Sequence, residues 1–294
     1  MTDSSLSKRV FFKIVEAFRL NRIWRKRPPS PDNGAPLRVA LICIAKDEDN
    51  YINEWIDYHL KLGVDEIFIY QNDWRMKPVA HPNVHLIEFD GDCKQLAAYN
   101  DFIINRSTPF DFGIFIDVDE FVCLIRDKDI KRFLLHYVEH AAVGLNWRFF
   151  GDNGRKDIGT DGYSLLKRFT RCGKKLNKHI KTIVNFKRIP ADARFSTPHH
   201  ISSARHWYLT VSTDLRYYIH GYFHSHFNYD IAWLNHYRGK TLAEFKSNKK
   251  AKGRSDLPRS NPDQVADISL FVESNLNDMP NTTALDFFIR EPSE

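Results

Sequence analysis

The alternation of apolar and polar residues predicts strands and helices in turn over the first half of the chain. Residues 39–45 are nearly all apolar, which is typical of a strand covered on both faces of a sheet. Strands alternating with helices predict an α/β fold with a mostly parallel, doubly wound sheet flanked by helices. Further strands are predicted at 65–70, 84–89 and 112–117, and apolar residues at helical spacing predict helices at 52–60 and 95–105.

The second half of the chain has a less regular pattern. We expect a helix at 130–140, strands at 143–149, 165–169 and 180–186, and a helix at 265–276. A Pro-rich segment at 28–34 is typical of a linker. These features divide the chain into an N-terminal arm and linker at 1–36, a main domain at 37–255 and a C-terminal extension at 256–294.

Basic residues gather in two segments, at 8–27 and 238–254, within a chain of net charge +6. A phosphorylated substrate or an anionic membrane fits this charge. Nucleic acid is not expected as a partner, because the basic segments flank the predicted sheet instead of interleaving with aromatic residues. Residues 1–27 predict a basic amphipathic helix on a membrane or, alternatively, a helix packed on the domain or a partly disordered arm.

The chain carries four cysteines without a Cys-x-x-Cys pair, so neither a zinc ribbon nor a redox motif is predicted. The sequence shows neither a secretory leader nor an apolar run long enough to span a bilayer. We therefore expect a cytoplasmic protein with reduced thiols, located at the cytoplasmic face of the inner membrane if the basic arm binds lipid.

The most informative segment is 112–121, where an apolar run leads into Asp117, Asp119 and Glu120. Carboxylates at the carboxyl end of a parallel strand lie where open α/β sheets bind ligands, and their oxygens suit Mg²⁺ or Mn²⁺. Strand-end aspartates are also common without any metal. Because two other predicted strands lead into Asp47 and Asp73, we expect the three strand ends to line one site.

Several segments within residues 38–255 resemble glycosyltransferases of the GT-A fold, with family 92 and the family-2-like bacterial enzymes as the nearest relatives. These segments are 45–48, 54–59, 62–65, 70–73, 98–101, 115–121, 146–151, 168–171 and 235–245. The resemblance implies a Rossmann-like GT-A domain with an irregular C-terminal acceptor region. It also implies transfer of a hexose from a nucleotide sugar, usually UDP-linked, to a glycan or lipid-linked saccharide, with Mn²⁺ or Mg²⁺ on the aspartate motif.

The resemblance places a nucleotide-sugar site at the strand ends. It implies that Asp117 contacts the ribose or the metal and that Asp119 binds the metal. His236 is the preferred histidine ligand of the metal and His200 is the alternative, from a group that also includes His199, His224 and His226. The other implied nucleotide-binding residues are Ala45, Lys46, Asp47, Glu48, Asp73, Gln95, Asn100, Arg238 and Lys240.

An inverting transfer needs a carboxylate that takes the proton of the acceptor hydroxyl. Asp152 is the first candidate and Asp161 is the second, although Asp152 in its Gly-Asp-Asn-Gly segment also fits a plain turn. Two other functions stay open. One is a metal-dependent phosphohydrolase that uses Asp117 and Asp119, with Asp117 as the nucleophile and a lysine on a later strand, and the other is a non-catalytic protein that binds sugars or nucleotides.

Overall fold

The computed structural model describes residues 36–76, 81–174, 177–204, 209–216, 229–252 and 268–290. The basic helix predicted at 1–27, the linker that follows it, and His224 and His226 lie outside these residues. No helix among the described residues is long and apolar enough to cross a lipid bilayer.

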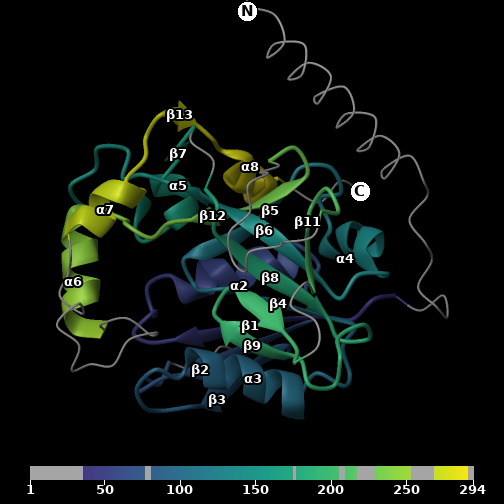
Figure 1. The fold of residues 1–294 in the computed structure, drawn as a ribbon. Helices are drawn as coiled ribbons and strands as arrows, with labels where there is room; N and C mark the ends of the chain where they lie inside the picture. The colour runs from purple at the N-terminus through teal and green to yellow at the C-terminus, as the bar shows by residue number, and fades with distance from the viewer. Residues whose placement is uncertain are drawn as a thin grey trace, which may run out of the picture.

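One half of the central sheet is parallel, as the alternation of elements predicts (Figure 1). Its strands lie in the order β3-β2-β1-β4, so the first strand of the chain lies inside the sheet. All three pairs between these strands are parallel. Their bounds are β1 (Val39–Ala45), β2 (Glu66–Gln71), β3 (Val84–Glu88) and β4 (Phe112–Phe115).

The other half of the sheet is mixed, which differs from a doubly wound sheet. β8 pairs antiparallel with both β4 and β6, β12 pairs parallel with β6, and β5 pairs antiparallel with β12. A ninth strand, β11, also pairs with β6. The protein is therefore an α/β protein built on one large mixed sheet. The bounds are β5 (Glu120–Leu124), β6 (Ala142–Phe149), β8 (Ile180–Asn185), β11 (Thr210–Ser212) and β12 (Ala232–His236).

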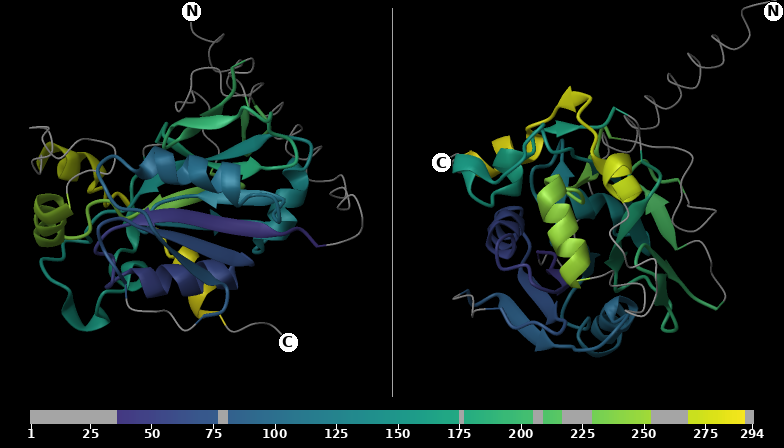
Figure 2. Two further views of the ribbon diagram at one scale, coloured as in Figure 1. Left: turned by 90° about the horizontal axis from the view of Figure 1, so that it is seen from below. Right: turned by 90° about the vertical axis from the view of Figure 1, so that its left-hand side faces the viewer.

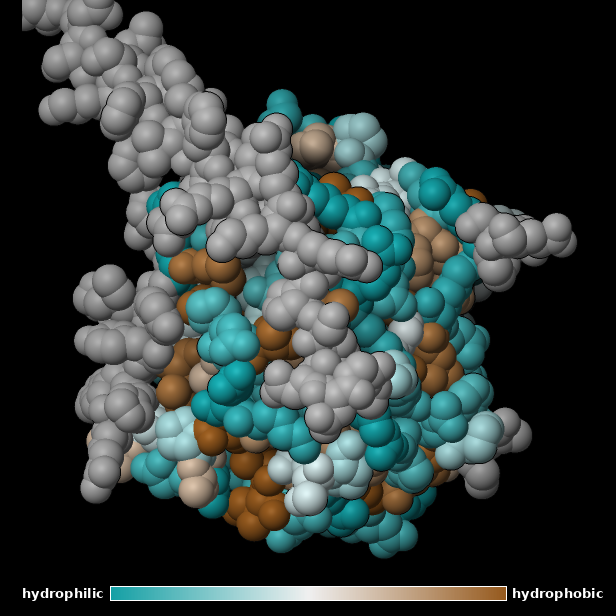
Figure 3. Space-filling view, turned by 90° about the vertical axis from the view of Figure 1, so that its right-hand side faces the viewer, coloured by the Kyte–Doolittle hydropathy of each residue, from teal (hydrophilic) through white to brown (hydrophobic). Residues whose placement is uncertain are grey.

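Helices α2 (Ile52–Lys61) and α3 (Gln95–Asn105) cover opposite faces of the parallel strands (Figure 2). Alternate residues of β1 face the two cores: Leu41 packs in the cluster that contains the apolar residues of α2, and Ile42 packs in the cluster of α3. This two-sided burial explains why β1 is almost wholly apolar. On the face that Figure 3 shows, the apolar residues of the described part are scattered among polar ones.

The remaining elements surround the mixed half of the sheet. Two short antiparallel pairs form, β9 with β10 and β7 with β13, and α8 packs on α5 and β5. The bounds are α4 (Ile130–Leu134), η1 (Leu135–Tyr137), η2 (Gly159–Asp161), α5 (Leu165–Arg168), β7 (Arg171–Cys172), β9 (Arg194–Thr197), β10 (His200–Ser202), α6 (Leu242–Lys252), α7 (Ile268–Ser274), β13 (Met279–Pro280) and α8 (Thr283–Ile289).

The strand predicted at 165–169 is wrong, because this segment forms the short helix α5. Ser164 Oγ caps the helix by accepting the Lys167 N–H at 3.1 Å, and Glu54 accepts the Leu165 N–H at 2.7 Å. In a short apolar run, the spacing of apolar residues does not distinguish a buried strand from a buried helix. The capping contacts decide the outcome, and half of them come from a distant part of the sequence.

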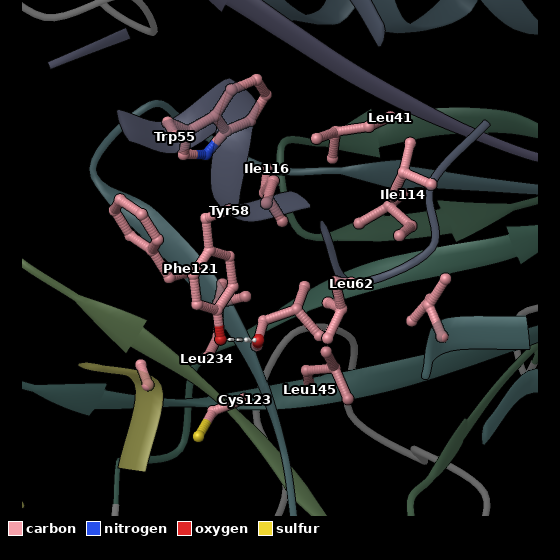
Figure 4. Close-up of a cluster of buried hydrophobic side chains, with 14 of the residues drawn as sticks. Leu41, Trp55, Tyr58, Leu62, Ile114, Ile116, Phe121, Cys123, Leu145 and Leu234 are labelled. Atoms are coloured by element: carbon pink, nitrogen blue, oxygen red, sulfur yellow. Dashed lines mark hydrogen bonds between the residues drawn. The ribbon is translucent and has the colours of Figure 1, made fainter. Parts of the chain in front are cut away.

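Helix α2 fixes strand β5 through side chains inside the core (Figure 4). Tyr58 Oη donates a hydrogen bond to the Val122 carbonyl at 2.7 Å, and Trp55 Nε1 donates to the Glu120 carbonyl at 2.8 Å. Both bonds are buried. Because β5 begins directly after Asp119, they set the point at which the acidic segment leaves the core.

Gly113 in β4 lies against the ring of Phe186, and a Cβ placed on it would approach Phe186 Cζ to 2.4 Å. Gly113→Val should lower the free energy of unfolding by about 1–3 kcal/mol, because overpacking displaces the ring. Urea unfolding measures the change. In a Phe186→Leu background, which lacks the clashing atoms, the same substitution should cost less. An equal cost in both backgrounds would rule out the ring as the cause.

Candidate functional site

Three strands of the parallel half end at one edge of the sheet. β1 lies between β2 and β4 and runs parallel to both, so the segments that follow these strands leave the sheet side by side. Lys46 Nζ lies 3.5 Å from Asp73 Oδ2 across this edge. The strand ends that carry Asp47, Asp73 and Asp117 therefore lie together, as the sequence predicts.

The backbone at two of these strand ends is unusual. Asp47 and Asp73 have φ angles of 51° and 47°, which lie in the left-handed region. Residues other than glycine seldom adopt this region, although aspartate does so more readily than most. Such positions are retained where the surroundings fix a turn, and they concentrate at binding sites. The backbone thus marks this edge as a candidate site independently of the acidic side chains.

Asp117 is fixed by direct hydrogen bonds to both carboxylate oxygens. Gln95 Nε2, at the start of α3, donates to Oδ1 at 2.7 Å, and Lys181 Nζ, in β8, donates to Oδ2 at 2.8 Å. The Asp117 N–H donates to Glu120 Oε2 at 2.8 Å. Gln95, which was predicted to lie near the nucleotide, is thus a direct partner of Asp117.

Lys181 is not among the residues predicted from the sequence, although a lysine inside the apolar run 180–184 is an unusual signal. Its side chain is buried, and Nζ lies 3.6 Å from Glu120 Oε2. Burial acts to lower the pKa of Lys181, but the charges of Asp117 and Glu120 outweigh burial and raise it well above its ordinary value. Burial raises the pKa of Glu120, against the effect of Lys181. The lysine therefore stays charged and the Asp117–Lys181 ion pair persists.

Asp119 lies next to His236 because β5 and β12 pair antiparallel. Glu120 is opposite His236 in this register, and His236 Nε2 lies 3.7 Å from Asp119 Oδ1. Lys240 Nζ lies 3.9 Å from Asp119 Oδ2. Burial lowers the pKa of His236 to about 3, although Asp119 acts in the other direction. The imidazole is therefore neutral near pH 7 and has a lone pair for a metal or a proton donor.

The rings of three histidines surround Trp147. His179 stacks on the indole at a centroid distance of 5.0 Å, His236 lies at 4.4 Å, and His199 meets it edge-on at 5.1 Å. His200, the alternative metal ligand, begins β10 and is buried there. The paired strands β5 and β12 thus bring His236 to the aspartate motif.

Lys240 is supported by a network of buried polar side chains. Its Nζ lies 4.6 Å from the centre of the Tyr51 ring, and Tyr51 Oη donates to Glu244 at 2.6 Å. Arg168, which is fully buried, binds both carboxylate oxygens of Glu244 at 2.8 and 2.6 Å. Thr241 Oγ1 also donates to Glu244 at 2.6 Å. The network holds the turn that carries Lys240 against the start of α2.

Other residues predicted at the nucleotide have structural contacts. Asn100 donates to the Phe195 carbonyl at 3.2 Å and accepts the Phe195 N–H at 2.8 Å, which fixes β9 on α3. The Glu48 carbonyl accepts backbone N–H groups at the start of α2, and Ala45 is the buried last residue of β1. Arg238 lies close enough to His236 to act electrostatically on its pKa.

The two candidate bases lie in the region after β6. Asp152 accepts hydrogen bonds from Asn275 Nδ2 at 3.1 Å and Asn277 Nδ2 at 3.3 Å, and from the Gly154 N–H at 2.8 Å. It therefore joins this turn to the C-terminal segment. Asp161 forms an ion pair with Arg155 at 2.5 Å.

Among the described residues, Asp119 and His236 form a pair whose side chains suit a divalent cation. No group of three or more His, Cys, Asp or Glu side chains within the described residues has the arrangement of a metal site. Mg²⁺, however, is usually held by only one or two protein carboxylates together with water and substrate phosphates. A carboxylate and a neutral imidazole 3.7 Å apart suit a cation that takes its remaining ligands from a bound diphosphate.

Neither a protein-family model nor a curated protein sequence matches this chain.

The Arg168–Glu244 pair predicts a pH effect on stability. Burial acts to raise the pKa of Glu244, but hydrogen bonds, first of all from Arg168, lower it from 4.5 to about 2. A depressed carboxyl pKa stabilises the fold above the unfolded value, and this contribution is lost as pH falls from about 4.5 through about 2. Glu244→Gln should lower the free energy of unfolding at pH 7 by roughly 3 kcal/mol, because Arg168 loses its charged partner.

Urea titrations of both proteins between pH 7 and pH 2 measure this effect. The difference between wild type and Glu244→Gln should shrink steadily below pH 4.5, because acid removes the same charge from the wild type. A difference that stays constant down to pH 2 would contradict the proposed ion pair.

Proposed function

We propose that the protein is a cation-dependent glycosyltransferase of the GT-A type, which transfers a hexose from a UDP-linked donor to a saccharide or lipid-linked saccharide. The observation that carries the proposal is the position of Asp119 beside His236 and Lys240, at the same edge of the parallel strands as the turn that begins with Lys46. Ligands of α/β proteins bind outside the carboxyl ends of the strands.

The nucleotide half of the donor fits the ends of β1 and β2. Lys46 and Asp73 lie 3.5 Å apart there, and each follows its strand by one or two residues. A carboxylate at Asp47 or Asp73 accepts hydrogen bonds from base N–H groups and ribose hydroxyls. The side chain of Asp117 is 35% exposed and can accept a further hydrogen bond despite its two protein partners.

The diphosphate fits the cationic side of the site, at Asp119, His236 and Lys240. A bound Mn²⁺ or Mg²⁺ would be held by Asp119 and His236 and would offset the charge that develops on the leaving diphosphate. Lys240 donates hydrogen bonds to phosphate oxygens and supplies a fixed positive charge. Arg238 is the second residue after the end of β12 and adds a second cation.

The transfer forms one bond and breaks one. The acceptor oxygen bonds to the anomeric carbon, the bond from that carbon to the diphosphate oxygen breaks, and its electron pair leaves with UDP. The acceptor proton passes to a carboxylate, for which Asp152 and Asp161 are the candidates. A single displacement of this kind inverts the anomeric centre.

The phosphohydrolase alternative requires a lysine from a later strand beside the nucleophilic aspartate, and Lys181 of β8, 2.8 Å from Asp117 Oδ2, meets this requirement. This alternative leaves two features without a role, which are the turn that begins with Lys46 and the segment 147–151, and the transferase is therefore preferred. A non-catalytic nucleotide-binding protein shares the same contacts, and the release of UDP from UDP-hexoses distinguishes it. A lipid-linked acceptor and attachment to the cytoplasmic face of an anionic membrane remain part of the proposal through the basic arm at 1–27.

The proposal predicts that UDP protects the protein against heat only together with Mn²⁺ or Mg²⁺. At a ligand concentration of 100 times the Kd, the stabilisation should reach about 2.7 kcal/mol, which is a rise in Tm of about 5 °C. Asp119→Asn should remove the cation-dependent part, because it weakens the bond between the protein and the cation. Differential scanning fluorimetry with UDP, with and without EDTA, measures both effects.

Asp57→Asn is the matched control, because Asp57 lies on the exposed face of α2, which the site does not use. It should keep the full protection. Protection by UDP that persists unchanged in EDTA would contradict the proposed cation–diphosphate contact.

A further inference from the structure

Lys181 places a buried ammonium group against the acidic segment, in contact with Asp117 and Glu120. It lies in the second position of β8, its residue is 1% exposed, and Nζ lies 2.8 Å from Asp117 Oδ2 and 3.6 Å from Glu120 Oε2. The ammonium group therefore occupies the space between two carboxylates, which is where a metal ion would bind if these carboxylates were its ligands.

The surroundings of Asp117 favour a fixed internal cation over a bound ion. Gln95 Nε2 occupies Oδ1 of the same carboxylate at 2.7 Å, so each oxygen already has a donor from within the protein. A metal ion at Asp117 would have to displace a buried ammonium group from two carboxylates. The ammonium group of Lys240 lies farther from Asp119, at 3.9 Å from Oδ2, and His236 Nε2 lies 3.7 Å from Oδ1.

We propose that Lys181 is an internal counter-cation that keeps Asp117 and Glu120 from binding metal, so that Asp119 and His236 are the protein ligands of the cation. This inference rests on the proposed function and assigns Lys181 as a positioning residue. It also decides between two roles of Asp117: the carboxylate accepts hydrogen bonds from the nucleotide and does not bind the metal.

The arrangement makes cation binding depend on the nucleotide. Two protein ligands hold Mg²⁺ or Mn²⁺ weakly until the diphosphate supplies further oxygens. Without Lys181, Asp117 and Glu120 would lose the ammonium group that lies 2.8 and 3.6 Å from their oxygens, and Asp117 would become able to bind a cation in the absence of nucleotide. Lys181 thus prevents the acidic segment from acting as a metal site on its own.

Binding of Mn²⁺ alone tests the inference directly. Electron paramagnetic resonance of free Mn²⁺ gives the affinity of wild type, Lys181→Met and the double variant Lys181→Met with Asp117→Asn, all without nucleotide. Lys181→Met should bind Mn²⁺ at least about tenfold more tightly than wild type, because it releases Asp117 as a ligand. The double variant should return to within about threefold of wild type. No gain in Lys181→Met, or a gain that survives Asp117→Asn, would overturn the inference.

A second comparison keeps the test valid if Lys181→Met does not fold. With UDP present, Asp117→Asn should leave the Mn²⁺ affinity within about threefold of wild type, whereas Asp119→Asn should lower it at least about thirtyfold. Equal losses in the two variants would overturn the inference and leave the proposed function intact. If wild type binds no UDP with Mn²⁺, the proposed function fails, and the nucleotide-free comparison still decides the role of Lys181.

Discussion

The antiparallel pair of β5 and β12 is the contact on which the candidate site depends. It places Glu120 opposite His236 and thereby brings Asp119 to within 3.7 Å of a histidine more than a hundred residues further along the chain. Helix α2 fixes the position of this pair, because Trp55 and Tyr58 donate buried hydrogen bonds to carbonyls of β5. A change in the register of this pair by one residue would turn His236 to the other face of the sheet.

Buried charges around the site serve two different purposes. The Arg168–Glu244 pair lies away from the acidic segment and fixes the turn that carries Lys240 through Thr241 and Tyr51. Lys181 of β8 contacts Asp117 and Glu120 of the acidic segment and neutralises part of its charge. Buried ion pairs add little net stability because of their desolvation cost. Their value here lies in placing single charges at defined positions along one edge of the sheet.

The sequence predicts the parallel half of the fold well, because its strands are buried on both faces and read as apolar runs. Residues 39–45 match β1 at both ends, and the three following strands agree within two residues. The sequence pattern does not predict β5 or β12. Both strands are short and carry polar residues at one end, and such residues are typical of loops or binding sites. The helix expected at 130–140 ends at Leu134 and continues as a short 3₁₀ turn.

The site could be predicted only as far as local motifs reach. Asp117, Asp119 and the turn at 46–48 follow directly from strand ends, and His236 came from a segment resemblance. Lys181 could not be assigned, because its partners lie 64 and 61 positions away, in pairs that only the folded sheet creates. Asn100 was assigned to the nucleotide because its segment resembles the transferases. In the structure its side chain instead forms hydrogen bonds to the backbone of Phe195 in β9.

The central claim is that His236 and Asp119 together hold the cation that binds the diphosphate. Pulsed electron paramagnetic resonance of the Mn²⁺–UDP complex detects a nitrogen nucleus bound directly to the metal. The account predicts an imidazole nitrogen coupling in the wild type that disappears in His236→Ala. A complex that shows no nitrogen coupling, or one that keeps it without His236, would contradict the account.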